Sequence, residues 1–476
     1  MTPLSLRPHQ TRAWKLINVY GRFALYFAVG TGKTIAGLAV LREQVTRGND
    51  RWLVVAPIQV IPGWIRSARE WFPELRIWSP AKIYGITDHR ATLARWGVTG
   101  YDPKMAVEEA FRRAQIVILN PQMMIPRKTG EDERGRAIRR ERPWTQAQYD
   151  GLIVDESDIF GDPKSQTTKT FLRLAGRVNK LILLSGLPSP KDALDLWAQG
   201  YALGCWEDKH FRFCQRFGVQ NRFGAWSARP DGKEEILRLL KTRAWFLEAS
   251  SDLGIPETQQ IIRWFRSTGK RAACGKTPTQ VREIVEACFR GVGVKYEKLR
   301  QVTAGLLRLE DLEGREIVMD VHRDRLDALT ELAAELGESR AVIWYQHTWA
   351  RDRALELLGE RATCSGDGVS AAETARRWER FCAGKVQFFV AHPKSLGKGT
   401  DGGQMVANNS IWLENTDSYR DYHQAVGRLA RSGQTKPVFN FHLAEEGSID
   451  EALLDCVEKK RDWAEYVQEY LERGEL

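Results

Sequence analysis

The chain has 476 residues, of which 43% are hydrophobic, and its 71 Lys and Arg against 61 Asp and Glu give a formal net charge of +10. This length allows roughly two to four domains with sizeable cores, which excludes a wholly disordered protein. The basic charge favours an anionic partner, nucleic acid or a membrane surface, and a basic enzyme without such a partner is the alternative. The seven cysteines form no CxxC pair or Cys/His metal cluster, and no apolar run could span a bilayer, so we expect a cytoplasmic protein.

A glycine turn near the N-terminus follows a predicted strand at residues 22–29 and precedes a predicted helix that begins at Lys33. Strand, glycine turn and helix form a phosphate-binding loop, because backbone N–H groups and the helix N-terminus converge on phosphate oxygens. The full pattern G-x-x-x-x-G-K-T is broken by Phe27. The residues predicted to bind ATP are Gly30, Thr31, Gly32, Lys33 at the β- and γ-phosphates, and Thr34, which is also a predicted Mg²⁺ ligand.

A pair of carboxylates follows a later strand. Apolar strands are predicted at 51–57, 115–120 and 151–154, and the last leads directly into Asp155 and Glu156. An ordinary acidic loop is the alternative, but an upstream phosphate-binding loop supplies a cation for the two acids to serve. We predict that Asp155 holds Mg²⁺ and that Glu156 orients or deprotonates the attacking water.

Two segments of the first half are unusual in composition. Residues 127–142 carry seven Arg and Lys against four acids, which is typical of a solvated mobile loop and leaves a duplex-contacting loop as the alternative. Residues 205–226 interleave aromatic and basic side chains. We expect a helical insertion whose aromatic rings form a small core, with stacking on bases as the alternative.

A second series of strands and helices begins near residue 340. Strands are predicted at 341–345, 386–390 and 410–413, followed by a helix from Ser418, its N-cap, to Arg431. Arg428 and Arg431 are three residues apart, so a helix would present both guanidinium groups on one face. Arginine pairs with phosphate bidentately and neutralises charge on a γ-phosphate, although a solvated basic helix face is the alternative.

Seven motifs in this order resemble those of a superfamily 2 helicase, and within it the Swi/Snf-like family of duplex-DNA translocases (DEAD/DEAH-type ATPases). They are LRPHQ at 6–10, GTGKT at 30–34, VVAPIQVIPGW at 54–64, DESD at 155–158, LLSGLPSP at 183–190, SLGKGTDGGQ at 395–404 and YHQAVGRLARSGQ at 422–434. The chain is most similar to the compact versions found in bacteriophages and bacteria. In a phage-encoded case the compartment is the host cytoplasm.

The resemblance implies an α/β protein of two tandem RecA-like lobes with mainly parallel sheets, at residues 1–253 and 254–476, with a helical protrusion or linker around 205–320. It implies that Gln10 recognises adenine, that Gly399 and Asp401 line the nucleotide side of the second lobe, and that Gln424, Arg428 and Arg431 face the triphosphate. Two departures from the family, Asp158 and Leu187, stand where coupling between hydrolysis and movement is expected.

These inferences predict an ATP- and Mg²⁺-dependent DNA translocase or helicase that remodels double-stranded or branched DNA by branch migration, annealing or protein displacement, as in recombination or repair. Binding is expected through phosphates without sequence preference, and a monomer is sufficient. The alternatives are an RNA helicase of the same superfamily, the motor subunit of a restriction-type system, and an inactive DNA-binding clamp.

Overall fold

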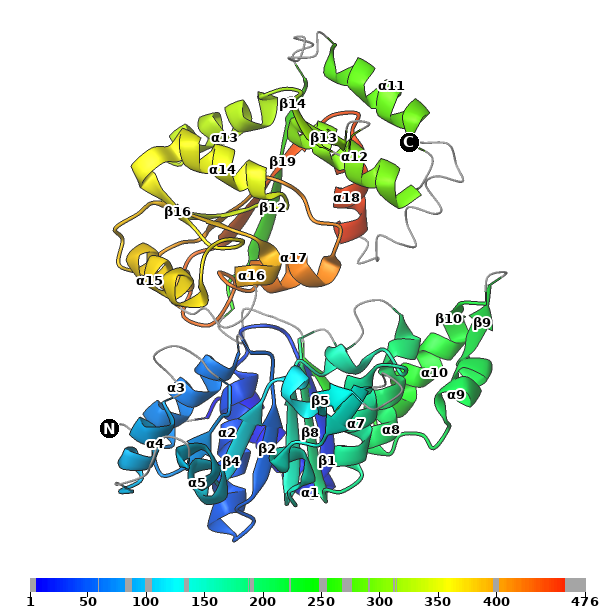
Figure 1. Cartoon of the computed structure of the whole chain (residues 1–476), viewed down its shortest axis with the longest axis vertical. Helices are drawn as coiled ribbons and strands as arrows, with labels where there is room; N and C mark the ends of the chain where they lie inside the picture. The colour runs from blue at the N-terminus through cyan, green and yellow to red at the C-terminus, as the bar shows by residue number, and fades with distance from the viewer. Residues whose placement is uncertain are drawn as a thin grey trace. The chain divides into compact units, whose positions relative to one another are not determined.

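The chain forms two compact units, Met1–Ala249 and Ser250–Leu476, each built around its own parallel sheet (Figure 1). The computed structural model describes residues 6–58, 60–81, 88–98, 105–131, 137–186, 188, 192–221, 224–247, 255–267, 276–289, 292–310, 313, 315–396 and 402–458. The predicted α/β fold, with two tandem units on mainly parallel sheets, is confirmed.

The first unit contains a seven-stranded sheet in the order β11-β1-β8-β7-β2-β4-β3, in which every neighbouring pair is parallel. Its strands are β1 (Arg22–Phe27), β2 (Trp52–Val55), β3 (Ile77–Trp78), β4 (Ile116–Leu119), β7 (Gly151–Asp155), β8 (Lys180–Ser185) and β11 (Ala244–Leu247). Because parallel strands end at the same edge of a sheet, the loops that follow β1, β8 and β7 emerge next to one another.

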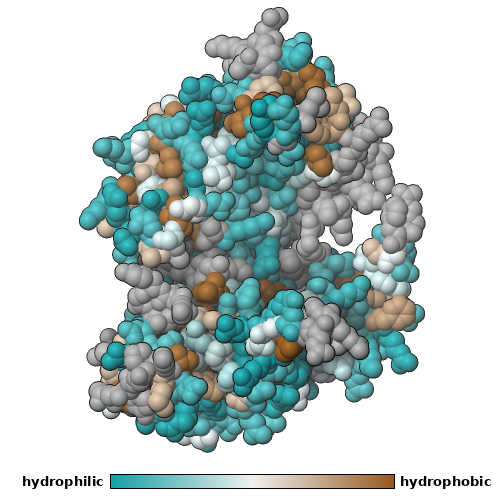
Figure 2. Space-filling model, in the orientation of Figure 1, coloured by the Kyte–Doolittle hydropathy of each residue, from teal (hydrophilic) through white to brown (hydrophobic). Residues whose placement is uncertain are grey.

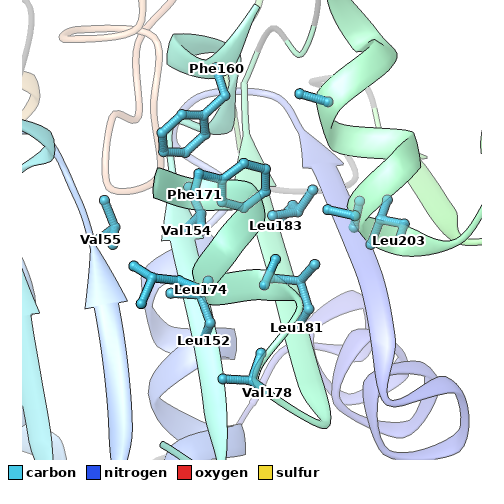
Figure 3. Close-up of a cluster of buried hydrophobic side chains, with 14 of the residues drawn as sticks. Val55, Leu152, Val154, Phe160, Phe171, Leu174, Val178, Leu181, Leu183 and Leu203 are labelled. Atoms are coloured by element: carbon cyan, nitrogen blue, oxygen red, sulfur yellow. The ribbon is translucent and has the colours of Figure 1, made fainter. Parts of the chain in front are cut away.

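Both faces of this sheet are covered, so its strands read as continuous apolar runs. Successive residues of β7 and β8 alternate between two cores: Leu152, Val154, Leu181 and Leu183 lie in one, Ile153 and Ile182 in the other. Figure 3 shows the first core, where the rings of Phe160 and Phe171 stack with centroids 4.3 Å apart. The helices of the second core are α1 (Pro8–Tyr20), α2 (Lys33–Thr46) and α3 (Ile61–Trp71).

The first core is closed by the remaining helices of the unit. They are α4 (His89–Arg95), α5 (Ala106–Arg113), α7 (Gln166–Ala175), α8 (Trp197–Leu203), α9 (His210–Phe217) and α10 (Pro230–Leu240), with the short helices η1 (Pro121–Met124), α6 (Pro143–Gln146), η2 (Ser157–Phe160) and η3 (Ala193–Leu196) between them. Two antiparallel hairpins complete the described part of this unit: β5 (Arg127–Glu131) with β6 (Ala137–Arg140), and β9 (Gly218–Gln220) with β10 (Trp226–Ala228).

The second unit contains a six-stranded sheet in the order β12-β19-β18-β15-β17-β16, again parallel throughout. Its strands are β12 (Thr258–Phe265), β15 (Ala341–Trp344), β16 (Ala362–Cys364), β17 (Phe388–Ala391), β18 (Asn409–Trp412) and β19 (Val438–Glu445). The surrounding helices are α13 (Asp324–Glu335), α14 (Thr348–Leu358), η5 (Gly359–Arg361), α15 (Ala371–Cys382), α16 (Pro393–Leu396), η6 (Gly403–Met405) and α17 (Tyr419–Val426). A smaller core joins α11 (Pro278–Cys288), α12 (Val292–Ala304), β13 (Leu306–Glu310), β14 (Glu316–Asp320) and α18 (Ile449–Glu458).

The middle of the chain differs from the expected single helical insertion. Strand β11 joins the first sheet and β12 the second, so the region around 205–320 is divided between the two units. The aromatic core expected in residues 205–226 is present, because Phe213 and Phe217 are buried beside α8 and α10. The solvated loop predicted at 127–142 is exposed as expected, but its described residues include the paired strands of the β5–β6 hairpin.

Hydrophilic side chains dominate the visible surface, and the exposed hydrophobic residues form small separate areas (Figure 2). No helix in the described ranges combines the length and apolar character needed to cross a bilayer.

Candidate nucleotide site

The glycine turn after β1 adopts a backbone that only glycine takes readily. Gly30 and Gly32 have φ of 85° and 83°, and Gly32 is the left-handed N-cap of α2. A Cβ atom at Gly32 would also collide with the side chain of Gln10. The turn therefore favours glycine at both positions for its backbone, and at Gly32 a side chain would also displace the amide of Gln10.

The start of α1 lies against this turn. Gln10 donates from Nε2 to the carbonyl oxygen of Gly32 at 3.3 Å, and His9 donates from Nε2 to the carbonyl oxygen of Thr31 at 2.9 Å. The backbone N–H of Arg7 donates to Gln10 Oε1 at 2.9 Å, which fixes the amide. The fold thus brings Gln10 next to the phosphate-binding loop, while its recognition of adenine stays a prediction.

Lys33 is folded back over the same turn. Its Nζ donates to the carbonyl oxygens of Phe27 at 2.7 Å and Ala28 at 3.2 Å. The side chain of Phe27, which replaces the first glycine of the motif, is fully buried and packs edge-on against Trp245. Only the backbone of Phe27 reaches the lysine, so this departure from the motif leaves the turn free of an added side chain.

Asp155 closes β7 as a buried carboxylate, 4% exposed. Its Oδ2 accepts a hydrogen bond from Trp64 Nε1 at 2.8 Å and its Oδ1 accepts one from the backbone N–H of Glu156 at 3.1 Å. Burial and, next, the charge of Glu156 raise the pKa of Asp155 to about 6, against the opposing effects of Trp64 and Lys33. The protein's own groups therefore stabilise the negative charge of Asp155 only in part, as expected of a carboxylate that binds a cation.

Glu156 is the only described non-glycine residue with positive φ, at 53°. A left-handed conformation costs a residue with a Cβ atom roughly 1–2 kcal/mol, so the surrounding structure must enforce it. Such strain is concentrated at functional positions, which agrees with the predicted role of this carboxylate.

The buried side-chain amide of Gln199 links strand β1, the short helix η2 and the segment after β8. Gln199 of α8 accepts at Oε1 from Tyr26 at 3.0 Å and from Ser157 at 2.8 Å, and donates from Nε2 to the carbonyl oxygen of Pro188 at 2.9 Å. Asp158 is buried in the adjacent η2. Sequence reasoning missed Gln199, because an isolated glutamine in a helix carries no motif, and Leu187 lies outside the described residues.

The turn after β8 approaches the phosphate-binding loop closely. A Cβ atom added at Gly186 would lie 3.0 Å from Val29 Cγ2 and 3.7 Å from Lys33 Nζ. A residue larger than glycine would therefore press on Val29 of the loop and come into contact with Lys33. This geometry explains the glycine of the SGLP string.

The arginine motif of the second unit lies on α17 and the turns after it. Ser418 caps the helix as predicted, accepting from the backbone N–H of Asp421 at 3.2 Å, and Gln424 is buried on α17. The predicted extension of the helix to Arg431 is wrong, because α17 ends at Val426. Arg428 and Arg431 stand on successive turns instead of one helical face, and Gly399 and Asp401 lie outside the described residues.

The second unit contains a cluster of two carboxylates and a histidine that the sequence did not indicate. Glu414 follows β18 and accepts hydrogen bonds from the backbone N–H groups of Gln346 at 2.8 Å and His347 at 2.9 Å, and from His347 Nδ1 at 2.6 Å. His347 Nε2 also donates to Glu297 at 2.8 Å. Burial opposes both charges, yet the pair lowers the pKa of Glu414 to about 2 and raises that of His347 to about 9.

The described residues contain no group of three or more His, Cys, Asp or Glu side chains placed to hold a metal ion. Asp155 and Thr34 instead offer single oxygen ligands at the ends of β7 and the start of α2. This donor set fits Mg²⁺, which proteins bind through one or two side chains together with substrate phosphates.

The first unit matches a family model described as the SNF2-related domain, over residues 27–243. A protein of Acyrthosiphon pisum secondary endosymbiont phage 1 is 24% identical over 68% of this chain and 72% of its own length. A CHD3-type chromatin-remodeling factor of Arabidopsis thaliana is 24% identical over 91% of this chain. A SWI/SNF-related, actin-dependent regulator of chromatin (subfamily A-like protein 1) of Xenopus tropicalis is 21% identical over 92% of this chain.

The chain spans only 34% and 42% of the lengths of these two eukaryotic relatives. Among solved structures, the Sulfolobus solfataricus SWI2/SNF2 ATPase core in complex with dsDNA is 17% identical, with a TM-score of 0.43 over 99% of this chain and 94% of that one. The domain match falls on the unit that contains the phosphate-binding loop and the Asp155–Glu156 pair, and the Xenopus tropicalis relative carries the SWI/SNF designation. Residues 27–243 therefore match the SNF2-related domain, and the chain as a whole is similar to Swi/Snf-like proteins.

Proposed function

We propose that the protein couples ATP hydrolysis to movement along double-stranded or branched DNA. The observation that carries the proposal is the edge of the first sheet. There the phosphate-binding loop after β1 and the acid pair after β7 are close enough for Lys33 to act on the pKa of Asp155. Two of the relatives are named as a chromatin-remodeling factor and a regulator of chromatin, which supports duplex DNA as the track.

In the proposed reaction the backbone of the glycine turn holds the phosphates, and Lys33 leaves the carbonyl oxygens of Phe27 and Ala28 to pair with them. Asp155 and Thr34 would hold Mg²⁺, which neutralises charge on the β- and γ-phosphates when it is bound. Glu156, held in its strained conformation, orients and deprotonates the attacking water.

The proposal extends to the second unit. Gln424, Arg428 and Arg431 would act on the triphosphate, because arginine neutralises the charge that develops on the γ-phosphate. Gln434 of the same motif has a structural role, because its Nε2 donates a hydrogen bond to the carbonyl oxygen of Ala407 at 2.8 Å. Branch migration, annealing and protein displacement are the DNA-remodelling reactions that such a cytoplasmic motor would drive in recombination or repair, and a monomer would suffice.

The test is steady-state ATP hydrolysis without nucleic acid and with duplex DNA, single-stranded DNA, a four-way junction or duplex RNA. We expect duplex or junction DNA to stimulate hydrolysis most. Glu156→Gln should lower the stimulated rate by about 10²–10⁴-fold, the range for loss of a general base. Stimulation by RNA alone would replace the proposal with an RNA helicase, and hydrolysis that no nucleic acid stimulates would overturn it.

A further inference from the structure

The β5–β6 hairpin of the first unit carries opposed cations. In its register Arg127 lies opposite Arg140 and Lys128 opposite Arg139, and all four side chains are exposed. Successive residues of a strand point to opposite faces, so each face of the hairpin presents one pair of cations. Like charges placed directly opposite each other destabilise a hairpin, so this register is unfavourable for the protein alone.

Among the described residues, little relieves this repulsion. Lys128 forms an ion pair with Glu131 on the same strand. No carboxylate among the described residues pairs with the guanidinium groups of Arg127, Arg139 or Arg140. An anionic ligand would supply the negative charge that these three arginines lack among the described residues.

The base of the hairpin is fixed to the first unit. Arg142 donates from Nε to the carbonyl oxygen of Ile125 at 3.1 Å, which ties together the two ends of the hairpin. Glu141 accepts two hydrogen bonds from Arg173 of α7, at 2.9 and 3.1 Å. The cations are therefore carried on an arm that is anchored to the ATP-binding unit.

We propose that this hairpin is an arm that grips the phosphate backbone of duplex DNA. The inference rests on the translocase function proposed above and names a DNA-contacting element of it. Arg and Lys contacts to phosphate hold DNA in register without reading sequence, as a translocase requires. An arm fixed to the ATP-binding unit would transmit the movement of that unit to the track.

The chemistry of the hairpin favours a duplex over a single strand. Residues 127–142 contain no aromatic side chain, and single-strand binding relies on aromatic rings that stack on bases. A two-stranded β-ribbon fits the major groove of B-DNA. Cations on both faces of such a ribbon can reach the phosphates of both strands that border the groove.

The test compares two full-length variants with equal loss of charge. R127Q/K128Q/R139Q/R140Q neutralises the hairpin, and R47Q/R76Q/K233Q/K241Q neutralises four exposed cations elsewhere in the same unit. Duplex affinity is measured over a range of salt concentrations, together with the DNA concentration that half-maximally stimulates ATP hydrolysis. Thermal melting and DNA-free ATPase rates establish that each variant is folded.

For the hairpin variant we expect the slope of log affinity against log salt to fall by about two to four, roughly one per lost phosphate contact. Half-maximal stimulation should need about tenfold more duplex, with the maximal rate retained. The control variant should keep the wild-type slope and affinity within about twofold, because its charges act only at long range.

Equal weakening of both variants would overturn the proposal, because it would show a general charge effect. Unchanged DNA affinity in the hairpin variant would also overturn it and would indicate another polyanion, such as an acidic protein. Equal losses on single-stranded and duplex DNA would overturn the assignment to duplex. Failure of the translocase proposal is seen separately, as wild-type hydrolysis that no DNA stimulates.

Discussion

A buried carboxylate lies at the end of a central strand in each of the two large sheets, and its pKa is raised in the first sheet and lowered in the second. Asp155 after β7 and Glu414 after β18 are 4% and 5% exposed. Burial and Glu156 raise the pKa of Asp155 to about 6. Burial acts in the same direction on Glu414, but His347 and two backbone N–H groups outweigh it and lower the pKa to about 2.

The difference shows that burial alone does not identify a functional acid. Glu414 is already paired with a histidine and fully hydrogen-bonded, so it stabilises the second unit without a ligand. The charge of Glu156 disfavours the ionised form of Asp155, and Trp64 and Lys33 offset this effect only in part. A bound cation would therefore stabilise the ionised form of Asp155. The first acid is therefore expected to matter for the reaction and the second for folding.

Asp155→Asn should give the largest effect. Loss of the proposed Mg²⁺ ligand removes several kcal/mol of transition-state stabilisation, about a thousandfold in ATP turnover. The melting temperature should stay the same or rise, because the variant removes a buried charge and keeps an acceptor for Trp64. Steady-state hydrolysis and thermal melting test both parts, and a strongly lowered melting temperature would show that Asp155 is structural.

Glu414→Gln should have the opposite profile. Removing the buried member of this ion pair leaves His347 with only the half-exposed Glu297 as its counter-ion, and breaking a buried pair typically costs about 3–5 kcal/mol of unfolding free energy. Denaturant unfolding measures the loss. Glu297→Gln is the matched control, because that carboxylate pairs with the other nitrogen of His347 but is 45% exposed and should cost less. Similar losses of unfolding free energy in the two variants would contradict the expectation that Glu414 contributes more to stability than Glu297.

The same cluster predicts a pH dependence of stability. The pKa of His347 is raised from 6.5 to about 9 in the folded protein, so its contribution is complete below pH 6.5 and is lost as pH rises toward 9. A shift of this size corresponds to at most about 3 kcal/mol. The denaturant concentration at the unfolding midpoint should fall from pH 6 to 7.5 to 9 for the wild type, and it should change less with pH for His347→Gln. The same fall of the midpoint with pH in both proteins would assign the pH dependence to other groups.

Most strands and the nucleotide-binding loop could be predicted, because buried parallel strands read as apolar runs and the loop is a local pattern. Residues 151–154, for example, match β7 almost residue for residue. The end of α17 was missed since the arginine spacing suggested a continuous helix. Gly427 and Gly433 lower helix propensity there, and the chain turns after Val426.

Contacts between distant segments could not be read from the sequence. Trp64 lies 91 residues from Asp155, and Ser157 lies 42 residues from Gln199. Neither pair has a spacing that a local pattern could reveal. The β5–β6 hairpin was missed for a different reason, because its dense charges mask the alternation by which a strand is recognised.

Trp64→Phe should give the smallest effect, and it tests directly whether the hydrogen bond to Asp155 matters for ATP hydrolysis. The phenyl ring preserves much of the packing beside Gly37 but removes the N–H that donates to Asp155 Oδ2. A hydrogen bond to a charged group is worth about 1.5–3 kcal/mol, so the ATPase rate should fall about tenfold or more if the bond holds the carboxylate in its working position. Trp52→Phe, which removes a hydrogen bond to the carbonyl oxygen of Asn49 in the same core, is the control for lost packing. If both variants lose activity equally, Trp64 acts through the core and not through Asp155.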